Sequence, residues 1–351
     1  MLQLAIEIGS DNVRAVIRQG REYDIVPLGS IGSPYLCPPI CLRIGNNYVF
    51  GEVAKLNAVS RPNDVIFLSD YAQRGLIDKK VLNSFVNYIC DRVYAIYKET
   101  VNDVSFIVPP YLNNPSIQKL LCDSIIDSGH NIAMPPDSAL AFAKSNLNVA
   151  YGDKICIIDM RDYPANVALV SRTQQSYNTL GSIELTDFSI NDCEKIIEEK
   201  IMENLLVDLE SSDNVFFAWI KSEIGMSIAQ NGLIDLLMGK DAILPLSFSS
   251  YDCIIQQSEF QNRIVPKIEN TWSQIQSLFQ NIKTSAAQVN QVVLLGSLFC
   301  SEFICERFRK CFIGYGSNPK FSISSNPKDD WAMCLSSLKS NVQSSEFVLK
   351  L

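Results

Sequence analysis

The sequence predicts an α/β protein whose chain forms two similar lobes on either side of a central cleft. Each half opens with an apolar strand that ends in a carboxylate, Glu7 in the first half and Asp159 in the second. A short turn and a second strand follow in each half, and then a helix, a buried strand and another helix. Because this order of elements occurs twice, we interpret the chain as an internal duplication with the two acidic hairpins at the floor of the cleft.

The first half contains two segments with clear helical signals. Residues 79–98 place apolar side chains at intervals of one to four, which predicts a helix with one buried face. Residues 115–127 follow Asn114, a frequent N-cap residue, begin with Pro115 and end just before Gly129, so they predict a second helix. We further expect strands at 4–9, 13–18, 48–50 and 104–108 and a helix at 52–59.

The second half follows the same rules. Two short apolar runs separated by a polar turn, 155–159 and 166–171, predict a second hairpin. We also expect helices at 191–210, 215–229, 257–282 and 301–312 and a last strand at 291–296. The first lobe is therefore expected to comprise residues 1–150, with 321–351 returning to it, and the second lobe residues 151–320 with a helical upper subdomain.

Charge and hydropathy disfavour several classes of partner. The 351 residues carry a formal net charge of −8, whereas nucleic acids and anionic membranes are bound by basic surfaces. No apolar run approaches the roughly 20 residues that a membrane-spanning helix needs, and the first residues lack the basic start of a signal peptide. We expect a soluble cytoplasmic protein that binds neither nucleic acid nor membrane.

The eleven cysteines are an odd number, widely scattered and mostly inside apolar runs. Buried free thiols are therefore expected rather than disulfides. The pair Cys37 and Cys41 and the cluster of residues 300, 305 and 311 lack CxxC spacing, and the chain has a single histidine, His130. We expect no metal site, and we interpret His130, which follows a predicted helix, as a cap rather than a catalytic group.

Seven short segments, in order along the chain, point to a family. They are IEIGSDN at 6–12, FGEVAK at 50–55, VSFIVPPYLN at 104–113, PDSALAF at 136–142, NTLG at 178–181, VVLLG at 292–296 and NPKD at 326–329. On these segments the chain resembles the nucleotide-binding domain of the seventy-kilodalton heat-shock chaperones (DnaK-like), within the actin and sugar-kinase superfamily. The resemblance implies the actin-like (ribonuclease H-like) ATPase-domain fold.

Two parts of that family are expected to be missing. Only about thirty residues separate the position of the family's catalytic lysine from Val104, too few for most of the accessory sheet of the upper first lobe. The chain ends at Leu351, where the family continues into a linker and a peptide-binding domain. We therefore expect no attached peptide-binding domain.

The resemblance assigns the first phosphate-binding hairpin to residues 7–12. Family ATPases bring backbone N–H groups to the phosphates and hold hydrated Mg²⁺ with carboxylates. Glu7 stands in place of the family aspartate, and Gly9 and Ser10 retain an N–H group and a hydroxyl. Asp11, followed by Asn12, replaces a threonine and places a negative charge toward the phosphates, so we expect this change to weaken nucleotide binding.

The second hairpin departs further from the family. Asp159 keeps the family carboxylate, but the glycine-rich turn is replaced by Arg161, Asp162, Tyr163 and Pro164. Proline has no N–H to donate, and a tyrosine fills the space that glycine leaves. Arg161 is the residue that offers an alternative phosphate ligand.

The other nucleotide contacts of the family are also altered. In the adenosine motif Gly296 is kept, whereas Ser297 replaces the second glycine. The remaining substituted positions are Asp70 for the lysine, Pro136 for a glutamate, Asn166 for the second aspartate of the hairpin, Cys300 for an arginine, and Ile220, Glu223 and Ile224 on the helix that packs on adenine.

The interpretation that follows is a chaperone-like pseudo-ATPase that acts as a protein-binding or regulatory module. We expect ATP and ADP with Mg²⁺ to bind weakly or not at all, and hydrolysis to be undetectable. One alternative is an active chaperone-like ATPase that uses Arg161 and Glu7 in a rebuilt site. A second alternative is an actin-like assembly scaffold.

Overall fold

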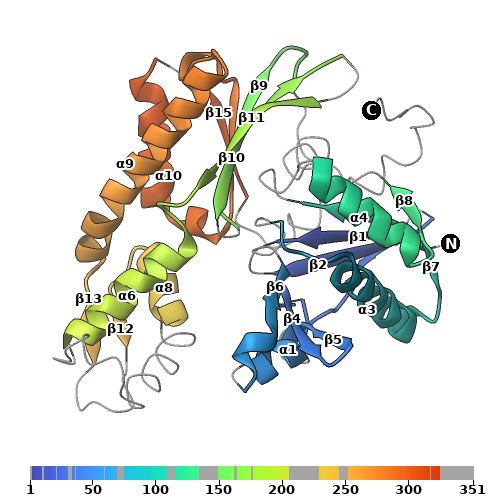
Figure 1. Ribbon diagram of the computed structural model, residues 1–351. Helices are drawn as coiled ribbons and strands as arrows, with labels where there is room; N and C mark the ends of the chain where they lie inside the picture. Colours follow the sequence, from blue (N-terminus) through green and yellow to red (C-terminus); the bar gives the residue numbers. More distant parts are fainter. Residues whose placement is uncertain are drawn as a thin grey trace. The chain divides into compact units, whose positions relative to one another are not determined.

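A computed structural model (Figure 1) describes most of the chain. The described residues are 2–324 except for 10–11, 21, 31–33, 36, 59, 69–74, 109–114, 134–148, 162–163, 175–176, 205–228, 245–251 and 317. They form several sheets and helices of a mixed α/β fold, which confirms the coarse class predicted from the sequence.

The described residues divide into two compact units. The first unit contains the chain up to Asp153 together with Ala168–Ser182, and the second contains Lys154–Val167 together with the chain from Ile183 to Ser324. The segment Ala168–Ser182, which the sequence analysis assigns to the second lobe, is thus grouped with the first unit. Most of the segment expected to return to the first lobe lies outside the described residues.

The first unit is built on a five-stranded sheet with the order β3-β2-β1-β7-β8. Its strands are β1 (Leu2–Ile8), β2 (Val13–Gln19), β3 (Glu22–Ile25), β7 (Val101–Ile107) and β8 (Asn131–Ala133). Strands β1 and β2 form the antiparallel hairpin predicted from the sequence, and β1 pairs in parallel with β7. The central strand β1 therefore has a paired neighbour on each side.

Two helices, α3 (Lys79–Tyr97) and α4 (Pro115–Asp127), lie side by side over one face of this sheet (Figure 1). The side chain of Asp78 caps α3 by accepting a hydrogen bond from the N–H of Lys80. The helices predicted at 79–98 and 115–127 are confirmed.

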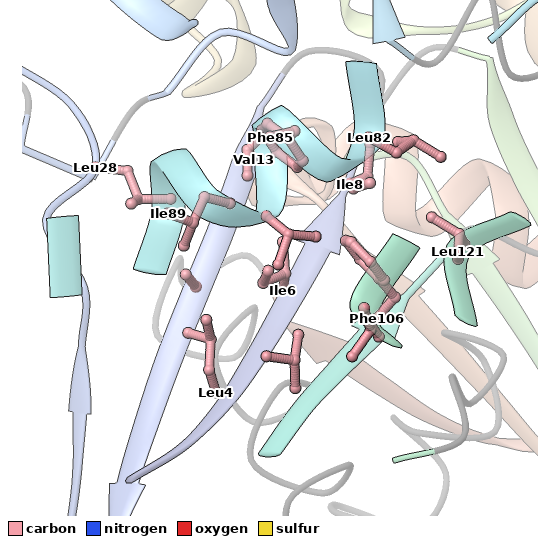
Figure 2. Close-up of a cluster of buried hydrophobic side chains, with 14 of the residues drawn as sticks. Leu4, Ile6, Ile8, Val13, Leu28, Leu82, Phe85, Ile89, Phe106 and Leu121 are labelled. Carbon is pink, nitrogen blue, oxygen red and sulfur yellow. The ribbon is translucent and has the colours of Figure 1, made fainter. Parts of the chain in front are cut away.

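The core under these helices is apolar throughout. Figure 2 shows Leu4, Ile6 and Ile8 of β1 in one apolar cluster with Phe85 of α3 and Phe106 of β7. Alternate residues of β1 face the other way, where the buried Ala5 packs with side chains of β2 and β7. A strand that is buried on both faces needs a nearly continuous apolar sequence, and this explains why most residues of β1 are apolar.

A second, smaller sheet in the first unit has the order β5-β4-β6. It consists of β4 (Ile40–Ile44), β5 (Asn47–Phe50) and β6 (Val65–Phe67), with helix α1 (Gly51–Ala58) directly after β5. The sequence analysis predicted β5 and α1 but neither β4 nor β6. The strands that it missed have three to five residues and are partly exposed, so their alternation is weak.

The other five-stranded sheet has the order β11-β10-β9-β14-β15, and its strands β9, β14 and β15 belong to the second unit. Its strands are β9 (Lys154–Asp159), β10 (Ala165–Arg172), β11 (Tyr177–Leu185), β14 (Gln291–Leu295) and β15 (Lys320–Ser324). Strand β14 runs parallel to both β9 and β15. Residues 321–324 therefore belong to this sheet, whereas the sequence analysis expected them in the first lobe.

The helices of the second unit include α6 (Ile190–Asn204), α8 (Ala229–Leu237), α9 (Gln257–Asn281) and α10 (Glu302–Gly314), and a short hairpin joins β12 (Ala242–Leu244) to β13 (Cys253–Ile255). Trp272 of α9 is buried and packs against Phe312 of α10. The helix expected at 215–229 lies almost entirely outside the described residues. In the described part of the chain, no helix combines the length and apolar character needed to cross a membrane.

Candidate functional site

The first hairpin carries a buried ion pair. Glu7 lies near the end of β1, and the strand register places Arg14 of β2 directly opposite. Arg14 Nη1 is 3.3 Å from Glu7 Oε2, and the two side chains are only 8% and 2% exposed. A buried carboxylate is tolerated when a charged partner compensates it. The pair with Arg14 therefore explains the buried Glu7 by a contact inside the hairpin, without a metal ion.

The turn of the first hairpin is closed by its own backbone and by a neighbouring segment. The N–H of Gly9 donates to the carbonyl of Asn12 at 3.0 Å. The side chain of Asn12 accepts from the N–H of Cys37 at 2.5 Å and donates to the carbonyl of Tyr35 at 3.2 Å. The N–H group of Gly9 that was expected at a phosphate is therefore engaged in the turn. Ser10 and Asp11 lie outside the described residues.

The second hairpin carries a closer ion pair. Asp159 is the last residue of β9, and Arg161 follows two residues later. Arg161 Nε and Nη2 donate to the two carboxylate oxygens of Asp159 at 2.9 and 2.7 Å, and the backbone N–H of Arg161 adds a bond of 3.1 Å. The side chains are only 6% and 7% exposed. This is the two-pronged geometry in which a guanidinium binds a carboxylate most strongly.

The rest of the second turn is only partly described. Asp162 and Tyr163 lie outside the described residues. Pro164 is described and has no N–H group. Asn166, at the position of the second family aspartate, is buried in β10.

The presence of glycine at position 296 is explained by backbone packing, without a bound nucleotide. It follows β14 with φ +122°, and a Cβ at this position would lie 2.8 Å from the backbone carbon and oxygen of Met160. The N–H of Met160 donates to the carbonyl of Leu295 at 2.8 Å, so the two chain segments approach closely. Only glycine fits such an approach. Ser297 begins a short 3₁₀ turn, Ser297–Cys300.

The remaining candidates contribute little to these hairpins. His130 Nδ1 lies 3.1 Å from the carbonyl of Val101 in β7, and the backbone N–H of His130 donates to the carbonyl of Ile125 in α4. The backbone of His130, and not its ring as expected, therefore caps the helix. The other substituted contact positions, Asp70, Pro136, Ile220, Glu223 and Ile224, lie outside the described residues.

Six of the ten described cysteines are buried free thiols, three are partly buried and Cys300 is exposed. Burial raises the pKa of Cys37 and of Cys41 to about 12, which keeps both protonated at neutral pH. Among the described residues there is no group of three or more histidines, cysteines and acids that could hold a metal ion.

A magnesium-bound nucleotide does not fit the described groups. Each of the two carboxylates needed for the hydrated metal is already paired with an arginine of its own hairpin. One backbone donor is used by the turn, and another is removed by Pro164. The sequence analysis missed Arg14, although its place seven residues after Glu7, across a four-residue turn, is the signal that would have identified it.

Comparison with known proteins adds no assignment. The chain matches no protein-family model, and no curated protein matches it significantly.

Proposed function

We propose that the chain is a degenerate actin-like domain, similar to the nucleotide-binding domain of the seventy-kilodalton chaperones, that has lost ATP binding and acts by binding a protein partner. The observation that carries this proposal is the buried pair of Asp159 and Arg161. It engages both the carboxylate needed for the metal and the cation that could have replaced the lost phosphate donors.

The pair argues against a rebuilt ATP site. Arg161 could bind a phosphate only by giving up two hydrogen bonds to Asp159. Asp159 would then remain buried and unpaired, which costs about 3–5 kcal/mol. A micromolar ligand has a total binding free energy of only about 8 kcal/mol, so this cost alone removes a large part of the affinity.

The first hairpin supports the same conclusion. Glu7 is held by Arg14 at 2% exposure, so an approaching hydrated metal would compete with a formed ion pair. The net charge of −8 adds repulsion toward a ligand that is itself polyanionic. Because both hairpin carboxylates are engaged by arginines, the described residues favour a binding module over an ATPase.

The test is calorimetric titration of MgATP and MgADP into the natural protein and into Arg161→Ala, with thermal shift as a second readout. We expect no binding tighter than about 1 mM in the natural protein. Micromolar binding that disappeared in Arg161→Ala would replace this proposal with the rebuilt ATPase.

The scaffold alternative is distinguished by assembly. Sedimentation of the protein over a range of concentrations, with and without MgATP, should show a species of constant mass. Filaments or open-ended oligomers would favour the actin-like scaffold instead.

A further inference from the structure

A groove of about 740 Å³ lies in the first unit, between the small sheet and helix α3. One wall is formed by the consecutive residues 46–50, which include all of β5. The other wall is one face of α3, whose lining residues are spaced by one, three or four positions: Ser84, Asn87, Tyr88, Asp91 and Arg92. A groove of this volume is large enough for a ligand the size of a few amino-acid residues.

Strand β5 presents an open edge to this groove. Among the described strands it pairs with β4 alone, to which it is joined by the two-residue turn Gly45–Asn46. The two residues that flank such a turn, Ile44 and Asn47, exchange backbone hydrogen bonds. Along an antiparallel pair of strands, hydrogen-bonded residue pairs alternate with pairs that are not hydrogen bonded, so Val49 is bonded to β4 whereas Tyr48 and Phe50 are not. The N–H and C=O of Tyr48 and the N–H of Phe50 therefore point away from β4. No backbone hydrogen bond joins these groups to another described residue.

The edge also lacks the usual protection against pairing. Natural edge strands carry charges or proline that prevent the addition of another strand. Strand β3, an edge strand of the same unit, contains Glu22 and Asp24. Strand β5 has the sequence NYVF, with neither a charge nor a proline.

Arg92 supplies a recognition group at the opposite wall. Its Nη2 donates to the carbonyl of Pro27 at 3.2 Å, whereas its Nε is buried without a hydrogen-bond partner. No described carboxylate lies within ion-pair distance of it. A carboxylate is the acceptor that fits a guanidinium best, so the charge of Arg92 favours an acidic ligand.

The rim of the groove sets further requirements. Val53 and Leu56 of α1 line it and are 57% and 73% exposed. Glu52 and Asp91 also line it and add two negative charges. A complementary ligand is therefore extended, largely apolar, and carries one carboxylate and one basic group.

We propose that this groove binds an extended peptide segment of a partner protein. The segment adds to the free edge of β5 as a further strand, places an acidic side chain at Arg92, and lays apolar side chains on Val53 and Leu56. The site shares no lining residue with either hairpin, so it does not depend on whether a nucleotide binds.

The probe is a fluorescein-labelled peptide of about eight residues, alternating valine and threonine with a central glutamate and a terminal lysine. Fluorescence anisotropy should show saturable binding to the full chain. A central glutamine in place of the glutamate should weaken binding about tenfold, and a central proline should abolish it. Equally tight binding of the proline peptide, or of N-acetylglutamate alone, would overturn strand addition.

Amide exchange of the protein gives the decisive readout. Bound peptide should slow exchange at Tyr48 and Phe50, whose N–H groups point outward, and leave Asn47 and Val49 unchanged because β4 already pairs them. Binding without protection of Tyr48 and Phe50, or no binding by any probe, would refute the proposal.

Variants of the protein complete the test. Arg92→Gln should weaken the glutamate peptide about tenfold and remove its advantage over the glutamine peptide. Val53→Glu should also weaken binding. Its matched control is Ile313→Glu in the second unit, which has the same exposed fraction of 57% and should leave binding unchanged. Equal effects of the last two variants would contradict the assigned site.

Discussion

The pair of Asp159 and Arg161 makes a measurable prediction about stability. In Arg161→Met the two side-chain hydrogen bonds of 2.7 and 2.9 Å are lost, whereas Asp159 stays buried. Charge-assisted hydrogen bonds contribute about 1.5–3 kcal/mol each, and breaking a buried ion pair from one side costs about 3–5 kcal/mol. We expect the free energy of unfolding to fall by about 3–5 kcal/mol.

The assay is equilibrium denaturation in urea, followed by the fluorescence of tryptophans that include the buried Trp272 of the same unit. The double variant Asp159→Asn/Arg161→Met removes both charges and should recover most of the loss. The control is Arg263→Met, whose partners Glu199 and Glu203 are surface residues and which should cost at most about 1 kcal/mol.

A small effect would refute the reasoning. If Arg161→Met cost less than about 1 kcal/mol, as a surface pair does, the guanidinium would not compensate a buried charge. Arg161 would then be available to a phosphate, and the rebuilt ATP site would become the better explanation.

Three further outcomes are expected. Gly296→Ala should cost at least about 2 kcal/mol in urea denaturation, because its Cβ would meet the backbone of Met160 at 2.8 Å and its φ of +122° strains any other residue; an unchanged midpoint would contradict this. Burial raises the pKa of Cys37 and Cys41 from 9.0 to about 12, so the unfolded chain releases these protons first. These two thiols alone should lower stability by about 2 kcal/mol between pH 9 and 10, and Cys90 and Cys305, whose pKa burial also raises, should add to this fall; a stability that rose over this range would contradict the sign. Among the described cysteines Cys300 is exposed, and mass spectrometry after brief iodoacetamide treatment at about pH 8 should find it alkylated before Cys37 and Cys41; the opposite order would be incompatible with their burial.

The elements that could be predicted from sequence are those with strong local signals. The helix at 115–127 has the bounds expected from Pro115 at its start and Gly129 beyond its end. The apolar strands at 2–8 and 154–159 have long buried runs, so they were also found. A strand of three residues such as β8 is too short to show the alternation of apolar and polar residues that identifies a strand. Its pairing also depends on residues far away in the sequence.

The site was predictable only in part, for a different reason. The residue types at 7, 159 and 161 were identified from the sequence, but what each one binds depends on geometry. Arg14 meets Glu7 only through the strand register, and Gly296 meets Met160 across 136 positions of sequence. The likeness to the chaperone family and the loss of ATP binding stay predictions until nucleotide titration is done.

The strand order of the two sheets constrains how the chain can fold during synthesis. Strand β9 is made about midway along the chain, but its parallel partner β14 begins only at Gln291. Until that residue leaves the ribosome, one edge of a strand whose residues 155–158 are all apolar has no partner within its own sheet. Contacts so distant in sequence form slowly, so the second unit is exposed to aggregation for longer than the first, whose strands β1 and β7 are complete by Ile107.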